Sequence, residues 1–151
     1  MFMVNVKKCL KIFDRVYVSS DSLEILETAM RAGAIPIKRT KKLCGDTPNI
    51  TVYRHALKYI DDDIIVAVQA NSPTIDKQLI EDAKYIMELG AEEIMTAYTG
   101  GKRYGSIWAL TRNRIKNYKD PYNPTPQAVI IDNSIDIHTQ EDYTKAIKFY
   151  E

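Results

Sequence analysis

The chain has 151 residues, of which 45% are hydrophobic and 27% charged, and its formal net charge is +1. This balance is typical of one globular domain with a sizeable core, and it gives no bulk electrostatic argument for nucleic acid or an anionic membrane as a partner. No apolar run approaches the ~18–20 residues that span a bilayer, and the N-terminus lacks the pattern of a signal peptide. The two cysteines, Cys9 and Cys44, form no CxxC pair. We therefore expect a single domain over residues 1–151 in the cytoplasm, with reduced thiols and no zinc site.

The first part of the chain alternates helical and extended patterns. Residues 2–13 have apolar side chains at helical spacing, and residues 15–19 have the composition of a strand. Asp21, with Glu24 three residues later, predicts a capping box at the start of the next helix. The buried stripe of this helix is expected to contain three apolar residues: Leu23, Leu26 and Met30. A short second strand is predicted over residues 34–38.

A polar loop over residues 39–46 precedes Thr47-Pro48, a favourable helix start. We expect this helix to reach about Ile60 with three inward-facing residues: Val52, Ala56 and Tyr59. The run IIVAVQANSP then begins with five apolar residues, which predicts a strand buried on both faces. It turns polar where such a strand would end. Ligands of open α/β sheets bind just outside the carboxyl ends of the strands, so we expect this strand to point into any site.

The second half of the chain continues the alternation. A helix is expected from Thr74 or Asp76 to Gly90, and a final helix is expected after Thr139, capped together with Asp142. The final helix has an apolar stripe of four residues: Tyr143, Ala146, Ile147 and Tyr150. Between these helices we predict three strands, at residues 93–98, 106–111 and 127–132. A helical turn is predicted at residues 112–118 and a proline-rich loop at residues 120–126. Strands alternating with helices predict βαβ units, an α/β fold and a mainly parallel sheet.

Candidate site residues are the polar groups that follow the predicted strands. The chain has no GxGxxG, P-loop, HExxH or GxSxG motif, so none of those chemistries is supported. The carboxyl ends of parallel strands lie on one edge, where these groups could converge: Ser20, Asp21, Asp46, Thr47, Gln69, Asn71, Ser72, Asp136 and His138. An amide such as Gln69 can bind a base or a sugar hydroxyl, and Asp136 could hold Mg²⁺. His138 would share a face with Asp136 in an extended segment.

Each of these residues also has a purely structural interpretation. Asp21 and Thr47 suit helix caps, Gln69 and Asn71 can tie down a loop, and Asp136 and His138 suit an ordinary surface. Lys102-Arg103, after two glycines, could clamp an anion or be exposed loop charges.

Five segments in this order resemble the cytidylyltransferases that activate acidic sugars, namely the CMP-sialic acid (acylneuraminate) synthetases and, more distantly, the CMP-KDO synthetases. The segments are FDRVYVSSDSLEI, GAIPIKRTKKLCGDTPNITVYRHAL, VAVQANSPTID, GSIWALTR and SIDIHTQEDYTKA. The resemblance covers residues 13–147. It implies the three-layer α/β/α nucleotide-diphospho-sugar transferase (GT-A-like) fold.

The resemblance also implies a reaction in which CTP and a 2-keto acid sugar give a CMP-sugar and pyrophosphate, with Mg²⁺ as cofactor. By position, Gln69, Asn71 and Ser72 match the segment that contacts sugar and nucleotide. Asp46, Thr47 and Asn49 match the segment beside the nucleotide. Asp136 matches the first of two closing aspartates associated with catalysis and the metal. The alternative interpretation is a non-catalytic sugar- or nucleotide-binding module, or a partner subunit, of the same fold.

Three features differ from the family pattern. The chain begins after the point where the family has a central strand and a basic, glycine-rich loop that holds the triphosphate. His138 stands in place of the second closing aspartate, and only TGGKRYG precedes Ser106 where the family has a long insertion. We therefore expect a gap or an open edge in the sheet beside residues 15–19 or 64–69. A homodimer, a swapped element or the N-terminal segment is expected to cover it.

Overall fold

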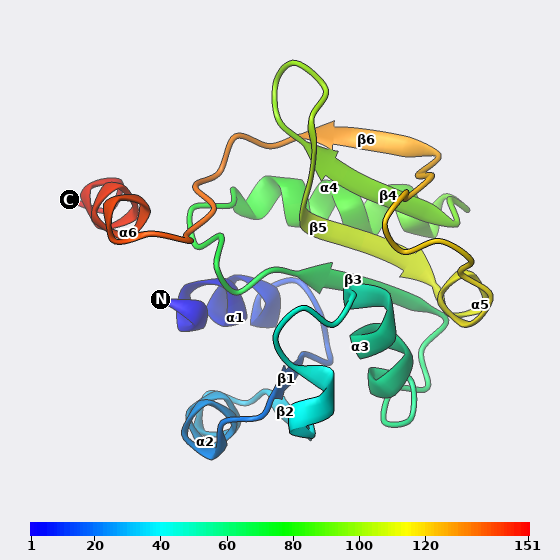
Figure 1. Cartoon of the computed structure of the whole chain (residues 1–151), viewed down its shortest axis with the longest axis horizontal. Coiled ribbons are helices and arrows are strands. Elements are labelled where there is room, and N and C mark those ends of the chain that lie inside the picture. Colours follow the sequence, from blue (N-terminus) through cyan, green and yellow to red (C-terminus); the bar gives the residue numbers. More distant parts are fainter.

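The computed structural model describes residues 1–151, whose elements alternate between helix and strand (Figure 1). The helices are α1 (Phe2–Leu10), α2 (Leu23–Arg31), α3 (Asn49–Ala56), α4 (Lys77–Glu88), α5 (Arg112–Lys116) and α6 (Gln140–Lys148), with a 3-10 turn η1 (Lys41–Leu43). The strands are β1 (Tyr17–Ser20), β2 (Ile35–Lys38), β3 (Ile64–Val68), β4 (Glu93–Ala97), β5 (Arg103–Thr111) and β6 (Ala128–Ile131). The α/β class predicted from the sequence is confirmed.

The strands form two separate sheets. β1 and β2 pair in parallel, and the larger sheet has the order β3-β5-β4-β6. β5 is antiparallel to both of its neighbours, whereas β4 and β6 are parallel. The expectation of a mainly parallel sheet is therefore wrong for the pairings, because the sheet is mixed. The strands of the larger sheet nevertheless run mostly in one direction, since only β5 runs opposite to β3, β4 and β6.

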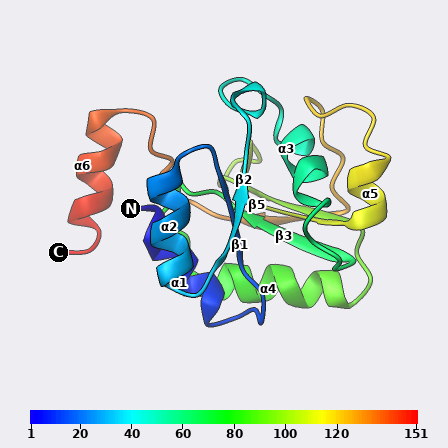
Figure 2. The same cartoon turned by 90° about the horizontal axis from the view of Figure 1, so that it is seen from below.

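Helices cover both faces of the larger sheet, which gives three layers (Figure 2). Alternate side chains of β5 point to opposite faces, as the pleat of a strand requires. Ile107 and Ala109 pack with the α4 residues Ile80 and Ala83 in one buried cluster. On the opposite face a second cluster joins α3, α5 and the sheet through six buried residues: Ile50, Met95, Trp108, Leu110, Ile115 and Tyr118.

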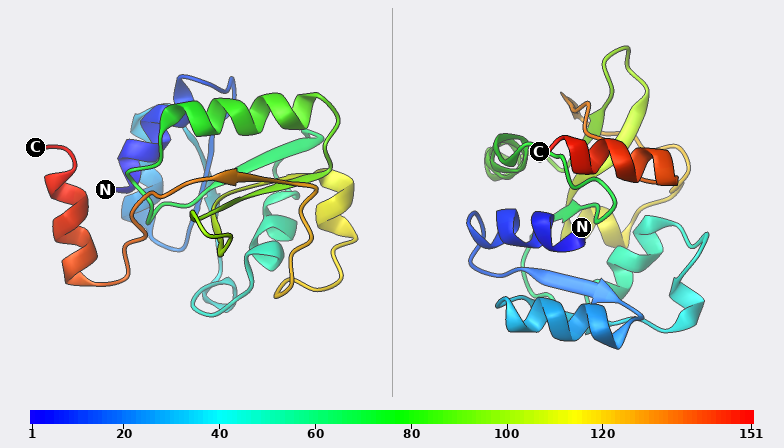
Figure 3. Two further views of the ribbon diagram at one scale, coloured as in Figure 1. Left: turned by 90° about the horizontal axis from the view of Figure 1, so that it is seen from above. Right: turned by 90° about the vertical axis from the view of Figure 1, so that its left-hand side faces the viewer.

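The two sheets are separated between β1 and β3. No strand pairs with β3 on the side away from β5, and no strand pairs with β1 on the side away from β2. Helix α1 lies beside this gap, with Val6 and Cys9 buried (Figure 3). The gap expected from the sequence is therefore present. The N-terminal helix lies along the gap and adds no strand to it.

Two of the predicted helix starts are wrong. Helix α2 is capped by Ser22, whose hydroxyl accepts a hydrogen bond from the Ile25 amide at 3.4 Å, so Asp21 is not the cap. Helix α3 begins at Asn49 after Pro48, and no side chain caps it. Thr47 instead donates its hydroxyl to the carbonyl oxygen of Cys44, at 3.0 Å. Of the two candidate starts for α4, the structure has Asp76 as the cap, 3.0 Å from the Gln78 amide.

Several apolar residues expected in buried stripes are exposed. These are Leu23 and Met30 on α2, Tyr59 after α3, and Tyr143, Ile147 and Tyr150 in or after α6. The capping box at the start of α6 is confirmed, yet only Ala146 of this helix is buried. The reason is that α6 projects from the body of the molecule, where its stripe has little to pack against (Figure 1). None of the helices combines the length and the apolar composition that crossing a membrane would require.

Candidate functional site

The turn after β3 brings Gln69, Asn71 and Ser72 together at the carboxyl end of the strand. Asn5 of α1 fixes this turn, because its Nδ2 donates to the carbonyl oxygens of Gln69 and Ser72, both at 2.9 Å. Asn5 is 3% exposed, its bond to Ser72 is buried and its bond to Gln69 is partly buried, so these bonds hold the turn against α1. The sequence reasoning missed Asn5. An asparagine within the apolar stripe of the first helix is the feature of the sequence that could have indicated a buried polar contact there.

Asn71 joins the turn to the segment that follows β6. Its side-chain Nδ2 donates to Asp136 Oδ1 at 2.7 Å, and its carbonyl oxygen accepts from the Ile137 amide at 2.9 Å. Asp136 Oδ2 lies 2.7 Å from His138 Nε2, whose side chain is 69% exposed. Three of the residues selected from the sequence therefore form one cluster, although sixty-five positions separate Asn71 from Asp136.

Gln69 and Ser72 lie on either side of Asn71 and contact two tyrosines. Gln69 Nε2 donates to the hydroxyl of Tyr53 at 3.4 Å. Burial raises the pKa of Tyr53, so this tyrosine stays protonated at neutral pH. The Ser72 hydroxyl contacts the hydroxyl of Tyr104, a residue of β5. Neither tyrosine was selected from the sequence, because no local pattern distinguishes them from core residues.

Tyr104 and Tyr98 form a stacked pair beside this cluster. Their ring centroids are 4.5 Å apart and their planes differ by 5°. Burial is the main reason that the pKa of Tyr98 is raised, and the nearby Asp136 carboxylate adds to the effect. The pKa of Tyr104 is raised for the same reasons, burial first. Both phenols are therefore neutral hydrogen-bonding groups at neutral pH.

The second carboxylate of this region, Asp132, is committed to the structure. It is 4% exposed and accepts hydrogen bonds from Ser106 and from the amide and hydroxyl of Ser134, at 2.8 and 2.6 Å. Asp136 is therefore the carboxylate of this edge that combines partial exposure with a place beside Asn71. The structure has no group of three or more His, Cys, Asp or Glu side chains suited to a metal ion.

The remaining predicted site residues lie outside the Asn71–Asp136 cluster. Asp46 is exposed, and Thr47 bonds only to carbonyl oxygens of its own loop. Lys102 and Arg103 lie at the β4–β5 hairpin, where the Arg103 guanidinium contacts the Pro124 carbonyl oxygen. Asn49 lines the cavity described next.

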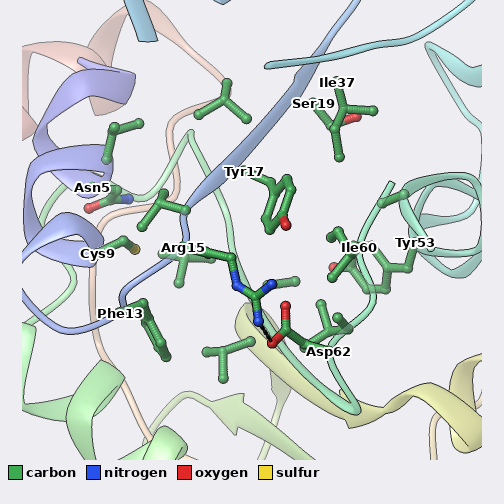
Figure 4. A pocket seen from close by; sticks show the side chains of 18 of the residues that line it. Asn5, Cys9, Phe13, Arg15, Tyr17, Ser19, Ile37, Tyr53, Ile60 and Asp62 are labelled. Carbon is green, nitrogen blue, oxygen red and sulfur yellow. Dashed lines mark hydrogen bonds and ion pairs between the residues drawn. The ribbon is translucent and has the colours of Figure 1, made fainter. Parts of the chain in front are cut away.

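A cavity of about 740 Å³ lies in the gap between β1 and β3 and extends to Gln69 at the carboxyl end of β3. Its walls come from α1, β1, α3 and β3 (Figure 4). Arg15 and Asp62 form an ion pair in its wall, and Tyr17 and Tyr53 also line it. The cavity is larger than the space that a few waters would fill. Its lining includes Gln69 and Ala70, which directly precede Asn71, but no residue of the Asn71–Asp136 cluster.

Comparison with known proteins gives likenesses of structure. The chain matches no protein-family profile and no curated protein sequence. CMP:2-keto-3-deoxy-manno-octonic acid synthetase, solved in complex with CTP, has a TM-score of 0.73 at 12% identity, over 99% of this chain and 86% of that one. A cytidylyltransferase from Leptospira borgpetersenii has a TM-score of 0.70 at 18% identity, over 99% and 75% of the two chains.

A third similar structure is Rv0371c from Mycobacterium tuberculosis, solved with manganese. Its TM-score is 0.64 at 13% identity, over 97% of this chain and 86% of that one. At such low identities these likenesses establish the fold alone. They confirm the nucleotide-sugar transferase-like α/β fold expected from the sequence, and the solved structures that share it include cytidylyltransferases.

Proposed function

We propose that this chain is a cytidylyltransferase-like protein of acidic-sugar activation, acting on CTP and a 2-keto acid sugar such as an N-acylneuraminate to give a CMP-sugar and pyrophosphate. The observation that carries the proposal is the bond between Asn71 and Asp136 at the carboxyl end of β3. Ligands of open α/β sheets bind at such strand ends. Support comes from the fold, which a synthetase in complex with CTP shares.

The amides at this strand end have the chemistry needed to recognise the substrates. A carboxamide presents both a donor and an acceptor, so Gln69, which lines the cavity, can pair with a base edge or with sugar hydroxyls. Tyr104 presents a neutral, partly exposed hydroxyl group, which suits a polyhydroxylated sugar. Ser72 is 0% exposed and contacts the Tyr104 hydroxyl, so its proposed role is to position Tyr104. Asp46, Thr47 and Asn49 are proposed to lie along the nucleotide, and Lys102 and Arg103 to meet its negative charge after the hairpin moves.

Asp136 is the residue proposed to hold a divalent cation. Mg²⁺ is commonly bound by one or two carboxylates together with substrate phosphates and water, and Mn²⁺ accepts the same oxygen ligands. One partly exposed carboxylate, oriented by Asn71 and flanked by His138, fits that description. When bound, such a cation offsets charge on the phosphates. Asn71 holds the carboxylate in place, and His138 can add a second ligand for a transition metal.

The proposed reaction exchanges one bond at the α-phosphorus for another and removes one proton. The hydroxyl oxygen on the anomeric carbon of the sugar bonds to the α-phosphorus of CTP, and the bond from that phosphorus to the bridging oxygen breaks. The hydroxyl proton passes to water, and pyrophosphate leaves with the electron pair of the broken bond. Because little covalent chemistry is asked of the protein, its contribution is to position the two substrates and to balance charge.

Pyrophosphate release from CTP tests this proposal. The chain is incubated with CTP, a divalent cation and either N-acetylneuraminate or 3-deoxy-manno-octulosonate, and release is expected only when the sugar is present. Asp136→Asn should lower the rate by at least about tenfold, since even outer-shell partners of metals contribute that much. Asp61→Asn is the matched control, because Asp61 is exposed and precedes β3 at its other end. Equal rates in the two variants would contradict the role of Asp136.

A second candidate is a non-catalytic module, or a partner subunit, that binds nucleotide or sugar. The observation that favours it is that no lysine or arginine side chain is bonded to Asn71, Asp136 or His138, whereas a triphosphate needs cationic partners. The same samples separate the candidates. Absence of pyrophosphate release, together with an increase in Tm on adding CMP, supports the binding module. Absence of both results contradicts both candidates.

A further inference from the structure

Lys8 of α1 has partners that are unusual for a lysine. Its Nζ donates to the carbonyl oxygens of Pro73 and Ile75, both at 2.6 Å, and lies 3.5 Å from Asn5 Oδ1. Lys8 is only partly exposed, and none of the ion pairs of the structure includes it. Burial lowers the pKa of its ammonium group, and the nearby Asp76 carboxylate offsets part of this effect. An ammonium group has three donors, which these three oxygen atoms match, so Lys8 is a cation bound mainly by main-chain oxygens.

The two carbonyl oxygens that Lys8 contacts have no main-chain partner. Pro73 and Ile75 are buried, lie between β3 and α4, and accept no hydrogen bond from a main-chain amide. The Pro73 oxygen has a second donor, the hydroxyl of Tyr150 at 2.6 Å, whereas the Ile75 oxygen has Lys8 alone. Buried carbonyl groups almost always have a donor, and losing it is unfavourable. The contacts of Lys8 are therefore needed to hold the chain in this conformation.

Asn5 and Lys8 bind one stretch of chain, the β3–α4 turn (residues 69–75). They are three residues apart and therefore lie on the same face of α1. Asn5 donates to the carbonyl oxygens of Gln69 and Ser72, so the two side chains together bind four carbonyl oxygens of the turn. The main-chain hydrogen bonds inside the turn are long by comparison, at 3.3 and 3.4 Å. The contacts from α1 therefore contribute more to the conformation of the turn than its own hydrogen bonds do.

The same turn carries side chains of the candidate site. Gln69 is its first residue, and the Asn71 side chain donates to Asp136 at 2.7 Å. A displacement of the turn would move both amides relative to Asp136. Misplacement of a group in a site by about 1 Å can cost about 10²-fold in rate. The conformation of the β3–α4 turn therefore matters to any ligand bound at this strand end.

We propose that Lys8, together with Asn5, is a positioning residue of the candidate site: its ammonium group holds the β3–α4 turn from α1, which aligns the amide side chains of Gln69 and Asn71 for binding. Lys8 acts through the turn and does not contact the ligand. The proposal rests on the proposed function in one respect, because it takes the ligand to be a cytidine nucleotide. Loss of the ammonium group should therefore loosen the turn, and weaker ligand binding should follow from that.

Residue-resolved amide hydrogen exchange on the free chain tests the effect on the turn. Lys8→Met removes the ammonium group and keeps an unbranched apolar side chain. Exchange should become at least about tenfold faster at the amides whose hydrogen bonds lie within the turn or end on it, since a hydrogen bond from a charged group contributes that much. These amides are Ser72, Ile75 and Ile137. The amides of Arg112 and Gln127, which bond across the larger sheet, should be unchanged. Lys7→Met is the matched control, because Lys7 is an exposed lysine of the same helix.

Calorimetric titration of CMP and of CTP, with a divalent cation present, tests the effect on binding. Lys8→Met should weaken the binding of both nucleotides by a similar factor of at least about ten, because a displaced turn affects the part that they share. A direct contact between Lys8 and the triphosphate would instead weaken CTP much more than CMP. Tyr150→Phe removes a neutral donor from the Pro73 oxygen. Its effects on exchange and binding should be smaller, since hydrogen bonds from charged groups are about twice as strong.

Chemical rescue separates a positioning role from a general loss of stability. Lys8→Ala removes the atoms that n-propylammonium contains, so this cation should restore slow exchange in the turn and nucleotide affinity. Tetramethylammonium has the same charge but no N–H donor, so it should restore neither.

Four results would overturn the proposal. They are unchanged exchange in the turn, faster exchange at all amides alike, a loosened turn with unchanged affinity or with weakening of CTP alone, and equal rescue by the two cations. The exchange measurements contain no nucleotide. If the wild-type chain binds neither CMP nor CTP, the proposed function fails, and the exchange and rescue results alone decide whether Lys8 holds the turn.

Discussion

Replacing Arg114 by methionine removes the charged partner of a buried carboxylate. Glu93 is 1% exposed, and its Oε2 accepts from Arg114 at 2.8 Å. Its Oε1 accepts from Trp108 Nε1 at 3.0 Å and from the Tyr118 hydroxyl at 2.6 Å. Methionine removes the guanidinium, whose carbon also lies 4.8 Å from the centroid of the Tyr118 ring. The Glu93 carboxylate is then left buried with two neutral donors.

The expected loss follows from these contacts. Removing one partner of a fully buried ion pair costs about 3–5 kcal/mol. The value here should lie below that range, because the Arg114 side chain is 33% exposed and Glu93 keeps two hydrogen bonds. We therefore expect a free energy of unfolding lower by about 2–3 kcal/mol. For a chain of this length that corresponds to a decrease in Tm of about 4–12 °C.

The assay is urea denaturation followed by circular dichroism, with a Tm measurement on the same samples. Lys116→Met is the matched control, because Lys116 is an exposed cation on the same helix and should change stability by less than about 0.5 kcal/mol. In the Arg114→Met background, the second substitution Glu93→Gln should lower the free energy of unfolding little further, since it removes the buried carboxylate charge that Arg114→Met leaves without a partner. Equal stability of Arg114→Met and Lys116→Met would refute this account of the buried pair.

Two further predictions concern α6 and the thiols. Thr139→Ala should fray α6 and lower its helical signal, because it removes the hydroxyl that accepts from the Asp142 amide at 3.2 Å. The Thr139 hydroxyl and neighbouring amides hold the pKa of Asp142 below its usual value, so the cap is fully formed above about pH 4 and is lost as the pH falls through the lowered pKa. Far-ultraviolet circular dichroism checks both effects, and an unchanged signal would contradict them. Burial raises the pKa of the Cys9 thiol to about 11, so iodoacetamide at pH 8 should modify Cys44 long before Cys9, with Cys9 reacting faster towards pH 11. Mass spectrometry of the digested protein follows both sites, and equal rates would show that Cys9 is not buried.

The sequence predicted the strand β3 and the polar residues that follow it, because both depend on local composition. The expectation that this strand is buried on both faces is wrong, because β3 lies at the edge of its sheet and its residues are only half-buried. A run of five apolar residues followed by the polar residues Gln69, Asn71 and Ser72 has few alternatives to a strand that ends at residue 68 or 69. The capping box of α6 was predicted for the same reason, since its partners Thr139 and Asp142 are three residues apart. The convergence of Asn71 and Asp136 needed the additional expectation that strand ends share one edge.

What the sequence did not predict depends on contacts between distant residues. Nothing local to β5 shows that it runs antiparallel between β3 and β4, since pairing partners are chosen by the whole sheet. Ser20, Asp21 and Ser22 are all capable caps, and the choice of Ser22 follows from where β1 ends. Asn5 could not be connected with Gln69 from the sequence, because the contact spans sixty-four positions. The stripe of α6 stays exposed because the linker carries this helix away from the body.

The most direct test of the central claim is to titrate CTP into the isotope-labelled chain, with a divalent cation present, and to follow the amide signals. The account predicts that the largest shifts occur at Gln69, Asn71 and Ser72, and that ATP produces smaller shifts at the same concentration. Asp136→Asn should weaken the binding of CTP by at least about tenfold. Shifts confined to residues far from the carboxyl end of β3, or no shifts at all, would contradict the assignment of this strand end as the nucleotide site.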